Sequence, residues 1–191
     1  MTRDVNVTMP ELMWESSPFL RLIVIFRNPV ERYHSAFYYY RWWQKNEPTP
    51  GPDDFHKAVV REIQEWKACV KDMGQAKCVR LYNPQQLVKG MYAEFLDEWL
   101  SSFPRDQLLF LRNEDYKVSQ REHMDAVFAF LGMRNLTEVE WEKVMGMPVK
   151  NVGKDKTDML PETRKMLEEF YAPFNAMLAS KLSDERYLWK S

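Results

Sequence analysis

The clearest hydrophobic pattern in the chain is a short, nearly continuous apolar run that helix signals follow at once. Residues 20–26 (LRLIVIF) are rich in β-branched side chains, and their length favours a buried strand of a parallel sheet. Asn28 is placed to cap a helix, Pro29 suits its first position, and Glu31 completes a capping-box pattern. We therefore predict a strand over 20–26 and a helix from 29 to about 43.

Most of the remaining chain shows the three-to-four-residue spacing of apolar positions that is typical of amphipathic helices. The pattern predicts an irregular lead-in over 1–19, loops over 46–53 and 147–160, and a connector over 71–80. A second buried strand is expected over 107–111. One helix is expected from Asp53, with an apolar stripe of Phe55, Val59, Ile63, Trp66 and Val70, and another from Pro84, with Leu87, Met91, Phe95 and Trp99 on one face. A third is expected over 115–131, with Val118, Met124, Val127, Phe128 and Leu131 facing inward. Two more are expected over 137–145 and from Pro161 to about 182, the last broken or kinked at Pro173.

This order of elements, with few strands separated by long helices, implies an α/β fold with a parallel sheet. Two strands make a thin sheet for a chain of 191 residues, which is long enough for one domain with one core.

Charge and composition argue against some classes of function. The formal net charge of -1 argues against general nucleic-acid binding, although a local basic pocket for one small anion is compatible with it. No run of 18 or more apolar residues predicts a membrane span, and residues 1–17 lack the apolar core of a signal peptide. Two N-x-Ser/Thr sequons, at Asn6 and Asn135, are weak evidence for glycosylation.

The two cysteines, Cys69 and Cys78, leave two interpretations open. They are either a pair of reduced thiols or a short disulfide loop in an oxidising compartment. Neither they nor the scattered His34, His56 and His123 show the spacing of a metal site, so no metal is expected.

Arg27 and Ser35 are the candidate binding residues. Arg27 follows the first strand directly, and ligands of open α/β sheets bind at the carboxyl ends of strands. The amide groups of a helix start favour an anion there, and a guanidinium adds a fork suited to phosphate. Ser35 lies on the helix face of Asn28 and Glu31, which points its hydroxyl to the same corner. The alternative is a well-capped helix with a surface arginine.

The segment IVIFRNPVERYHSAFYYY resembles the 3′-phosphate-binding motif of the sulfotransferase superfamily, a strand followed by R-[DN]-P-x-[ED]-R-x-x-S. The resemblance implies a P-loop-NTPase-like sulfotransferase fold. It also implies transfer of a sulfo group from 3′-phosphoadenosine 5′-phosphosulfate (PAPS), without a metal. By the same resemblance, Arg27 and Ser35 bind the 3′-phosphate of PAPS.

Three further segments resemble Golgi-type carbohydrate sulfotransferases: the Gly90–Leu100 helix, residues 108–115 and the Phe170–Leu178 helix. The surroundings of Cys69 and Cys78 are most similar to the branch that contains N-acetylgalactosamine 4-sulfate 6-O-sulfotransferase. The resemblance implies a disulfide, a chondroitin- or dermatan-like glycan acceptor, and a place in the Golgi lumen or membrane.

The loop over 150–156 lies where this family places a basic, glycine-containing loop over the donor. Gly153 allows the backbone to approach a phosphate, and Lys154 or Lys156 supplies charge. A solvated lysine loop is the alternative interpretation.

One family motif is absent from this sequence. The glycine-containing turn P-K-x-G-T-T, which wraps the 5′-phosphosulfate, has no counterpart, because none of the six glycines opens a helix after a strand. We therefore expect residues 1–191 to form a single, partial sulfotransferase domain whose sheet is incomplete on its N-terminal side.

The catalytic base stays unassigned at this stage. Val7 and Thr8 stand where the family has an acid and a lysine, Asp4 and Glu11 are only nearby carboxylates, and His34 faces away from the side of Ser35.

The aromatic cluster 38–43 is interpreted mainly as packing, with Trp42 or Trp43 as the better acceptor contact. Three function classes remain: a sulfotransferase, a non-catalytic nucleotide- or glycan-binding fragment of the same fold, and a helical interaction domain with accidental similarity.

Overall fold

A computed structural model describes residues 7–41, 50–148 and 157–190 of the chain. The chain divides into two compact units, one formed by residues 1–27 and 95–150 and the other by residues 28–94 and 151–191. The expectation of a single, partial domain stays a prediction.

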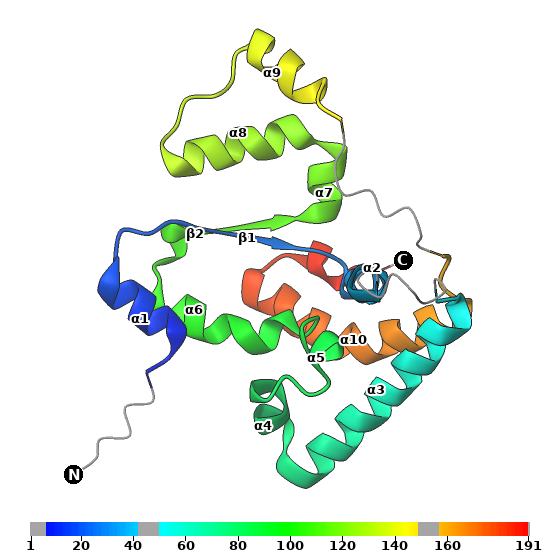
Figure 1. Ribbon diagram of the computed structural model, residues 1–191. Helices are drawn as coiled ribbons and strands as arrows, with labels where there is room; N and C mark the ends of the chain where they lie inside the picture. The colour runs from blue at the N-terminus through cyan, green and yellow to red at the C-terminus, as the bar shows by residue number, and fades with distance from the viewer. Residues whose placement is uncertain (1–6, 42–49, 149–156, 191) are drawn as a thin grey trace, which may run out of the picture. The chain divides into compact units, whose positions relative to one another are not determined.

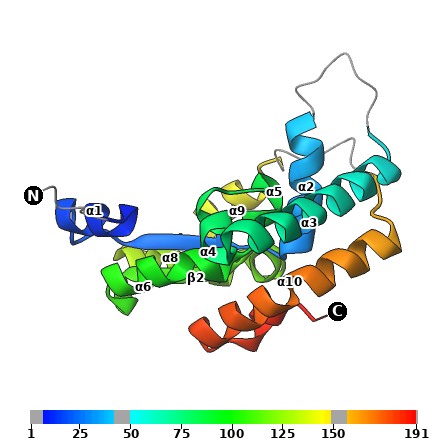
Figure 2. The same ribbon diagram turned by 90° about the horizontal axis from the view of Figure 1, so that it is seen from below.

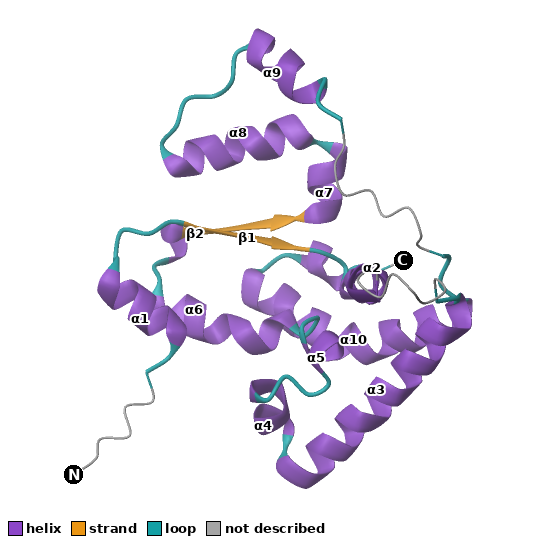
Figure 3. Cartoon of the chain, in the orientation of Figure 1, coloured by secondary structure: helices purple, strands orange, loops and turns teal. Residues whose placement is uncertain are grey.

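The first unit contains the sheet. Strands β1 (Leu22–Phe26) and β2 (Leu108–Arg112) pair in parallel, with Leu22 opposite Leu108 and Phe26 opposite Arg112 (Figure 3). The rings of Phe26 and Phe110 stack on one face, with centroids 5.9 Å apart. Both predicted strands and their parallel pairing are confirmed.

Helices flank this sheet in the first unit. α1 lies beside α6, and the rings of Trp14 and Phe103 meet edge to face with centroids 5.4 Å apart (Figure 1). The helices of this unit are α1 (Met9–Ser16), α6 (Leu96–Ser102), the 3₁₀ helix η2 (Arg105–Gln107), α7 (Asn113–Val118), α8 (Gln120–Leu131) and α9 (Glu138–Met145).

Two predictions for this unit are wrong. Part of the lead-in expected to be irregular is helical: Thr8 and Glu11 form a reciprocal capping box that starts α1 at Met9. The helix expected over 115–131 is divided at Ser119, and Val118, expected to face inward, is 86% exposed. The helix expected over 137–145 is confirmed, with Thr137 as its cap.

The second unit is helical, and its core is aromatic. In Figure 2, α2 crosses α3. There the ring of Phe55 lies 4.8 to 5.4 Å from those of Tyr33, His34 and Phe37. α3 and α10 meet at their N-terminal ends (Figure 1). The elements of this unit are α2 (Pro29–Arg41), α3 (Pro52–Met73), α4 (Gln75–Arg80), α5 (Gln85–Val88), η1 (Tyr92–Phe95), α10 (Pro161–Leu182) and η3 (Glu185–Leu188).

The helix expected from Pro84 through Trp99 is instead divided into α5, η1 and α6. The chain turns at Gly90, where a Cβ atom would lie 2.7 Å from the ring of Tyr171. Tyr171 is fully buried, and its hydroxyl donates a hydrogen bond of 2.8 Å to the Leu87 carbonyl. Periodicity did not reveal this turn because the apolar spacing continues across it.

Three other boundaries differ from expectation. α3 is capped at Gly51, whose amide donates to the Asp54 carboxylate, and not at Asp53. The connector expected over 71–80 is the end of α3 followed by α4. α10 continues through Pro173 without a break.

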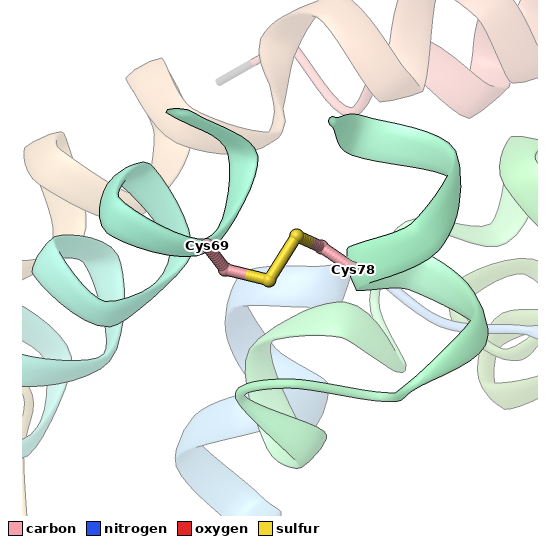
Figure 4. Close-up of a disulfide and its surroundings, with 2 residues drawn as sticks. All are labelled: Cys69 and Cys78. Carbon is pink, nitrogen blue, oxygen red and sulfur yellow. A yellow bond between two sulfur atoms is a disulfide. The ribbon is translucent and has the colours of Figure 1, made fainter. Parts of the chain in front are cut away.

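A disulfide joins α3 to α4. The sulfur atoms of Cys69 and Cys78 are 2.02 Å apart, and both side chains are buried (Figure 4). The interpretation of these cysteines as a disulfide is therefore confirmed. In the described parts of the chain, no helix has both the length and the hydrophobicity of a membrane span.

We expect Gly90→Ala to destabilise the protein by about 1–3 kcal/mol, because the added methyl group overpacks the core against Tyr171. Chemical denaturation of the wild type and the variant measures the loss. In a Tyr171→Leu background, where the aromatic ring is gone, the same substitution should cost much less. An equal cost in both backgrounds would contradict the contact.

The carboxyl group of Glu62 on α3 is expected to make stability depend on pH. Burial raises its pKa, and the hydroxyl of the buried Tyr33 lowers it by less. Neither Tyr33 Oη nor Glu62 Oε2 has a hydrogen bond of good geometry among the described residues. Because a raised pKa means that the fold disfavours the charged carboxylate, stability falls as pH rises through the folded-state pKa.

Glu62→Gln should therefore raise the melting temperature at neutral pH. The gain should shrink as pH falls from the raised folded-state pKa toward the ordinary carboxyl pKa of about 4.3, and it should vanish below that value, where Glu62 is neutral in both the folded and the unfolded chain. Thermal unfolding across this pH range tests it, with Glu65→Gln on an exposed position of the same helix as the control. A gain that does not vary with pH would refute the assignment.

Candidate functional site

The short connection between β1 and α2 carries the predicted phosphate motif. β1 ends at Phe26 and α2 begins at Pro29, so the strand end and the helix start are close in sequence. The Asn28 side-chain oxygen accepts a hydrogen bond of 2.9 Å from the Val30 amide, and its carbonyl accepts one of 2.8 Å from the Arg32 amide. Asn28 is therefore the predicted cap of α2.

Arg32, the second arginine of the motif, has a structural partner. Its guanidinium donates to the carbonyl oxygen of Gln86 in α5 and, at 3.4 Å, to the Gln86 side-chain oxygen. A short helix such as α5 leaves carbonyl groups without intrahelical donors, so an arginine is a suitable partner there. Arg32 thus joins α2 to α5.

The structure places the two predicted phosphate ligands as follows. Arg27 is the first residue after β1 and is half-buried, and it closes the first segment of the first unit. Ser35 is half-buried on the second turn of α2, in the second unit. Their joint contact with one phosphate stays a prediction.

The side chains of α2 near Ser35 meet the segment that leads into α10. Glu31 Oε1 accepts a hydrogen bond of 2.7 Å from Arg164, and the Tyr38 hydroxyl hydrogen-bonds to Thr157. From α3, the Nδ1 atom of His56 lies 2.7 Å from the hydroxyl of Thr163. Three contacts distant in sequence therefore fix residues 157–164 in the second unit.

Sequence reasoning missed the roles of Thr157, Arg164 and Gln86. The spacing of Glu31, Ser35 and Tyr38 shows which face of α2 they share, but sequence alone does not show what packs on that face. Gly153 and Lys154 lie outside the described residues, as do Lys156, Asp4, Trp42 and Trp43.

The two remaining candidates for a catalytic base have other roles. Glu11 accepts a hydrogen bond of 2.7 Å from the Thr8 amide, and this bond lowers the pKa of its carboxyl group. His34 is 2% exposed and packs against the rings of Phe55 and Tyr38, with centroids 4.8 and 5.1 Å away. The catalytic base stays unassigned.

The aromatic cluster of α2 divides into two kinds of position. Phe37 and Tyr38 are buried, in agreement with the packing interpretation, whereas Tyr39 is 61% exposed.

Comparison with known proteins agrees with the geometry. Residues 6–172 match the family model described as "Sulfotransferase domain". The chain is 37% identical to carbohydrate sulfotransferase 15 of Homo sapiens and 36% identical to that of Mus musculus; each match covers 91% of this chain and 32% of the relative. The chain thus spans about a third of the length of these curated relatives. Their similarity confirms the branch that the surroundings of Cys69 and Cys78 predicted.

A crystal structure of a sulfotransferase from Alicyclobacillus acidocaldarius shares the fold, with a TM-score of 0.60 over 92% of this chain and 59% of that one, at 19% identity. The strand–helix motif and the parallel pairing of β1 and β2 were expected from the sequence pattern and the disulfide from the resemblance, and the family match covers both units. The chain belongs to the sulfotransferase domain family.

Proposed function

We propose that this chain is the donor-binding part of an enzyme that transfers a sulfo group from PAPS to a glycan hydroxyl. One observation carries the proposal: in a member of the sulfotransferase family, Arg27 follows a parallel strand directly and Asn28 caps the helix that carries Ser35. The start of that helix presents backbone amides, and the guanidinium brings a permanent charge.

In this proposal Arg27 and Ser35 bind the 3′-phosphate of the nucleotide, and Gly153 and Lys154 contribute from the following basic loop. An oxygen of the acceptor hydroxyl attacks the sulfur atom and forms a new S–O bond. The bond from sulfur to the bridging phosphate oxygen breaks, and 3′-phosphoadenosine 5′-phosphate leaves. A base, which we do not assign, takes the hydroxyl proton. The mechanism includes no metal.

A chondroitin- or dermatan-like glycan is the proposed acceptor, since the surroundings of Cys69 and Cys78 resemble the N-acetylgalactosamine 4-sulfate 6-O-sulfotransferase branch and the matched relatives are named carbohydrate sulfotransferase 15. The buried disulfide between Cys69 and Cys78 supports an oxidising compartment, and we propose the Golgi lumen.

A non-catalytic nucleotide- or glycan-binding fragment is the second candidate. It is favoured by one observation, the lack of a P-K-x-G-T-T turn in this sequence. If the chain is catalytic, incubation with PAPS and chondroitin 4-sulfate should transfer sulfo groups to the glycan. No transfer, together with retained preference for a 3′-phosphate, would favour the fragment.

The donor assignment predicts a preference among nucleotides. 3′-Phosphoadenosine 5′-phosphate should bind at least about 10-fold more tightly than adenosine 5′-phosphate, because two or more charge-assisted hydrogen bonds depend on the 3′-phosphate. Isothermal titration calorimetry measures both affinities. Equal affinities would remove the assignment.

The same titration of variants tests which residues cause the preference for the 3′-phosphate. Arg27→Met should weaken 3′-phosphoadenosine 5′-phosphate about 10- to 100-fold and Ser35→Ala about 3- to 10-fold, with adenosine 5′-phosphate little changed. Arg61→Met is the matched control, because Arg61 is an exposed arginine on α3 that pairs with Glu65.

A further inference from the structure

One face of α2 carries Glu31, Ser35 and Tyr38. Their spacings of four and three residues place these side chains in one row along the helix. At about 1.5 Å of rise per residue, Glu31 and Tyr38 lie about 10 Å apart along the axis, with Ser35 between them.

Both ends of this row bind one segment of the chain. Glu31 pairs with Arg164, whereas Tyr38, further along the helix, bonds to Thr157, which comes earlier in the chain. The earlier residue of α2 thus binds the later residue of the segment, and the later binds the earlier. Residues 157–164 therefore run antiparallel to α2. They therefore pass along the face that carries Ser35.

The C-terminal end of this segment is held from a second side as well. The hydroxyl of Thr163 meets His56 of α3 at 2.7 Å, and Thr163 is fully buried. Arg164 is only partly exposed at its ion pair, with 43% of its side chain accessible and 30% of that of Glu31. The segment is thus anchored to two helices and not laid on the surface by one contact.

The charge of the pair also bears on an anion. Glu31 lies one helical turn from Ser35, and a carboxylate at that distance repels a phosphate dianion. Arg164 places a guanidinium against that carboxylate at 2.7 Å. The pair therefore both fixes the segment and offsets a negative charge beside the proposed phosphate position.

We infer that Glu31 and Arg164 are positioning residues of the donor site: their ion pair, aided by the Tyr38–Thr157 hydrogen bond, holds residues 157–164 as a wall beside Ser35 and tunes affinity for the 3′-phosphate. The inference rests on the proposed function. Neither side chain is assigned a contact with the nucleotide.

The test compares variants of the pair by calorimetry with 3′-phosphoadenosine 5′-phosphate and with adenosine 5′-phosphate. Arg164→Gln should weaken the first nucleotide about 5- to 30-fold and leave the second within about 2-fold, since the coupling acts on the 3′-phosphate. Glu31→Gln/Arg164→Gln should recover part of the loss, because the repelling carboxylate is gone. Arg164→Lys, which keeps the charge, should stay close to the wild type.

A matched control is Arg61→Gln, which breaks an ion pair with Glu65 elsewhere in the same unit. It should change neither affinity. Tyr38→Phe provides a second, milder variant, expected to weaken 3′-phosphoadenosine 5′-phosphate about 2- to 5-fold without removing a charge.

Melting temperatures separate positioning from a purely structural role. If Arg164→Gln lowers the melting temperature but leaves the affinity of the folded protein for 3′-phosphoadenosine 5′-phosphate unchanged, the inference is wrong. An equal loss for both nucleotides also overturns it. If the wild type itself does not prefer the 3′-phosphate, the proposed function fails, and the inference fails with it.

Discussion

Two neighbouring carbonyl groups of α5 join α2 and α10 within the second unit. Arg32 of α2 donates to the carbonyl of Gln86, and Tyr171 of α10 donates to that of Leu87. Backbone amides directly after α5 bond the carbonyls of Gln85, Leu87 and Val88, and the two side chains add donors from the longer helices at Gln86 and Leu87. α2 and α10 are thus joined through α5 as well as by their direct ion pair between Glu31 and Arg164.

Close to α5, two segments that lie far apart in the sequence are in contact. Gly90 and Tyr171 belong to two separate segments that resemble carbohydrate sulfotransferases, and the structure brings them into contact. The ring of Tyr171 occupies the space that a side chain at position 90 would need. A glycine is needed here for close approach and not for a special backbone angle, so the two residues constrain each other.

The elements that the sequence predicted correctly depend mainly on interactions between neighbouring residues. The strand over 20–26, the Asn28 cap and the α3 stripe are set by neighbouring residues, and each is found as expected. The parallel pairing of the distant strands β1 and β2 was also predicted correctly, whereas two helix predictions were wrong. The helix expected from Pro84 is divided near Gly90, which lies against the ring of Tyr171, and Val118 is exposed although its spacing is apolar. The prediction for α1 failed for another reason: the capping box of Thr8 and Glu11 is a local pattern that was present in the sequence but overlooked.

The candidate site shows the same division. Within one motif, Asn28 caps α2, Arg32 joins α2 to α5, and Glu31 binds Arg164. The sequence assigned Arg27 and Ser35 to the ligand and Asn28 to the helix cap, but it did not show the partners of Glu31 and Arg32. Arg32 binds Gln86, which is 54 residues away along the chain, and Glu31 binds Arg164, which is 133 residues away.

The buried bond between Cys69 and Cys78 governs how the protein can be made. The chain-entropy model assigns about 2–3 kcal/mol to closing a loop of this length, a large share of the stability of a small domain. Because Cys78 has no exposed surface, an oxidant cannot reach its sulfur once the helices have packed. The cross-link must therefore form while α3 and α4 are still open, and synthesis in a reducing cytosol would leave two enclosed thiols in a weakened fold.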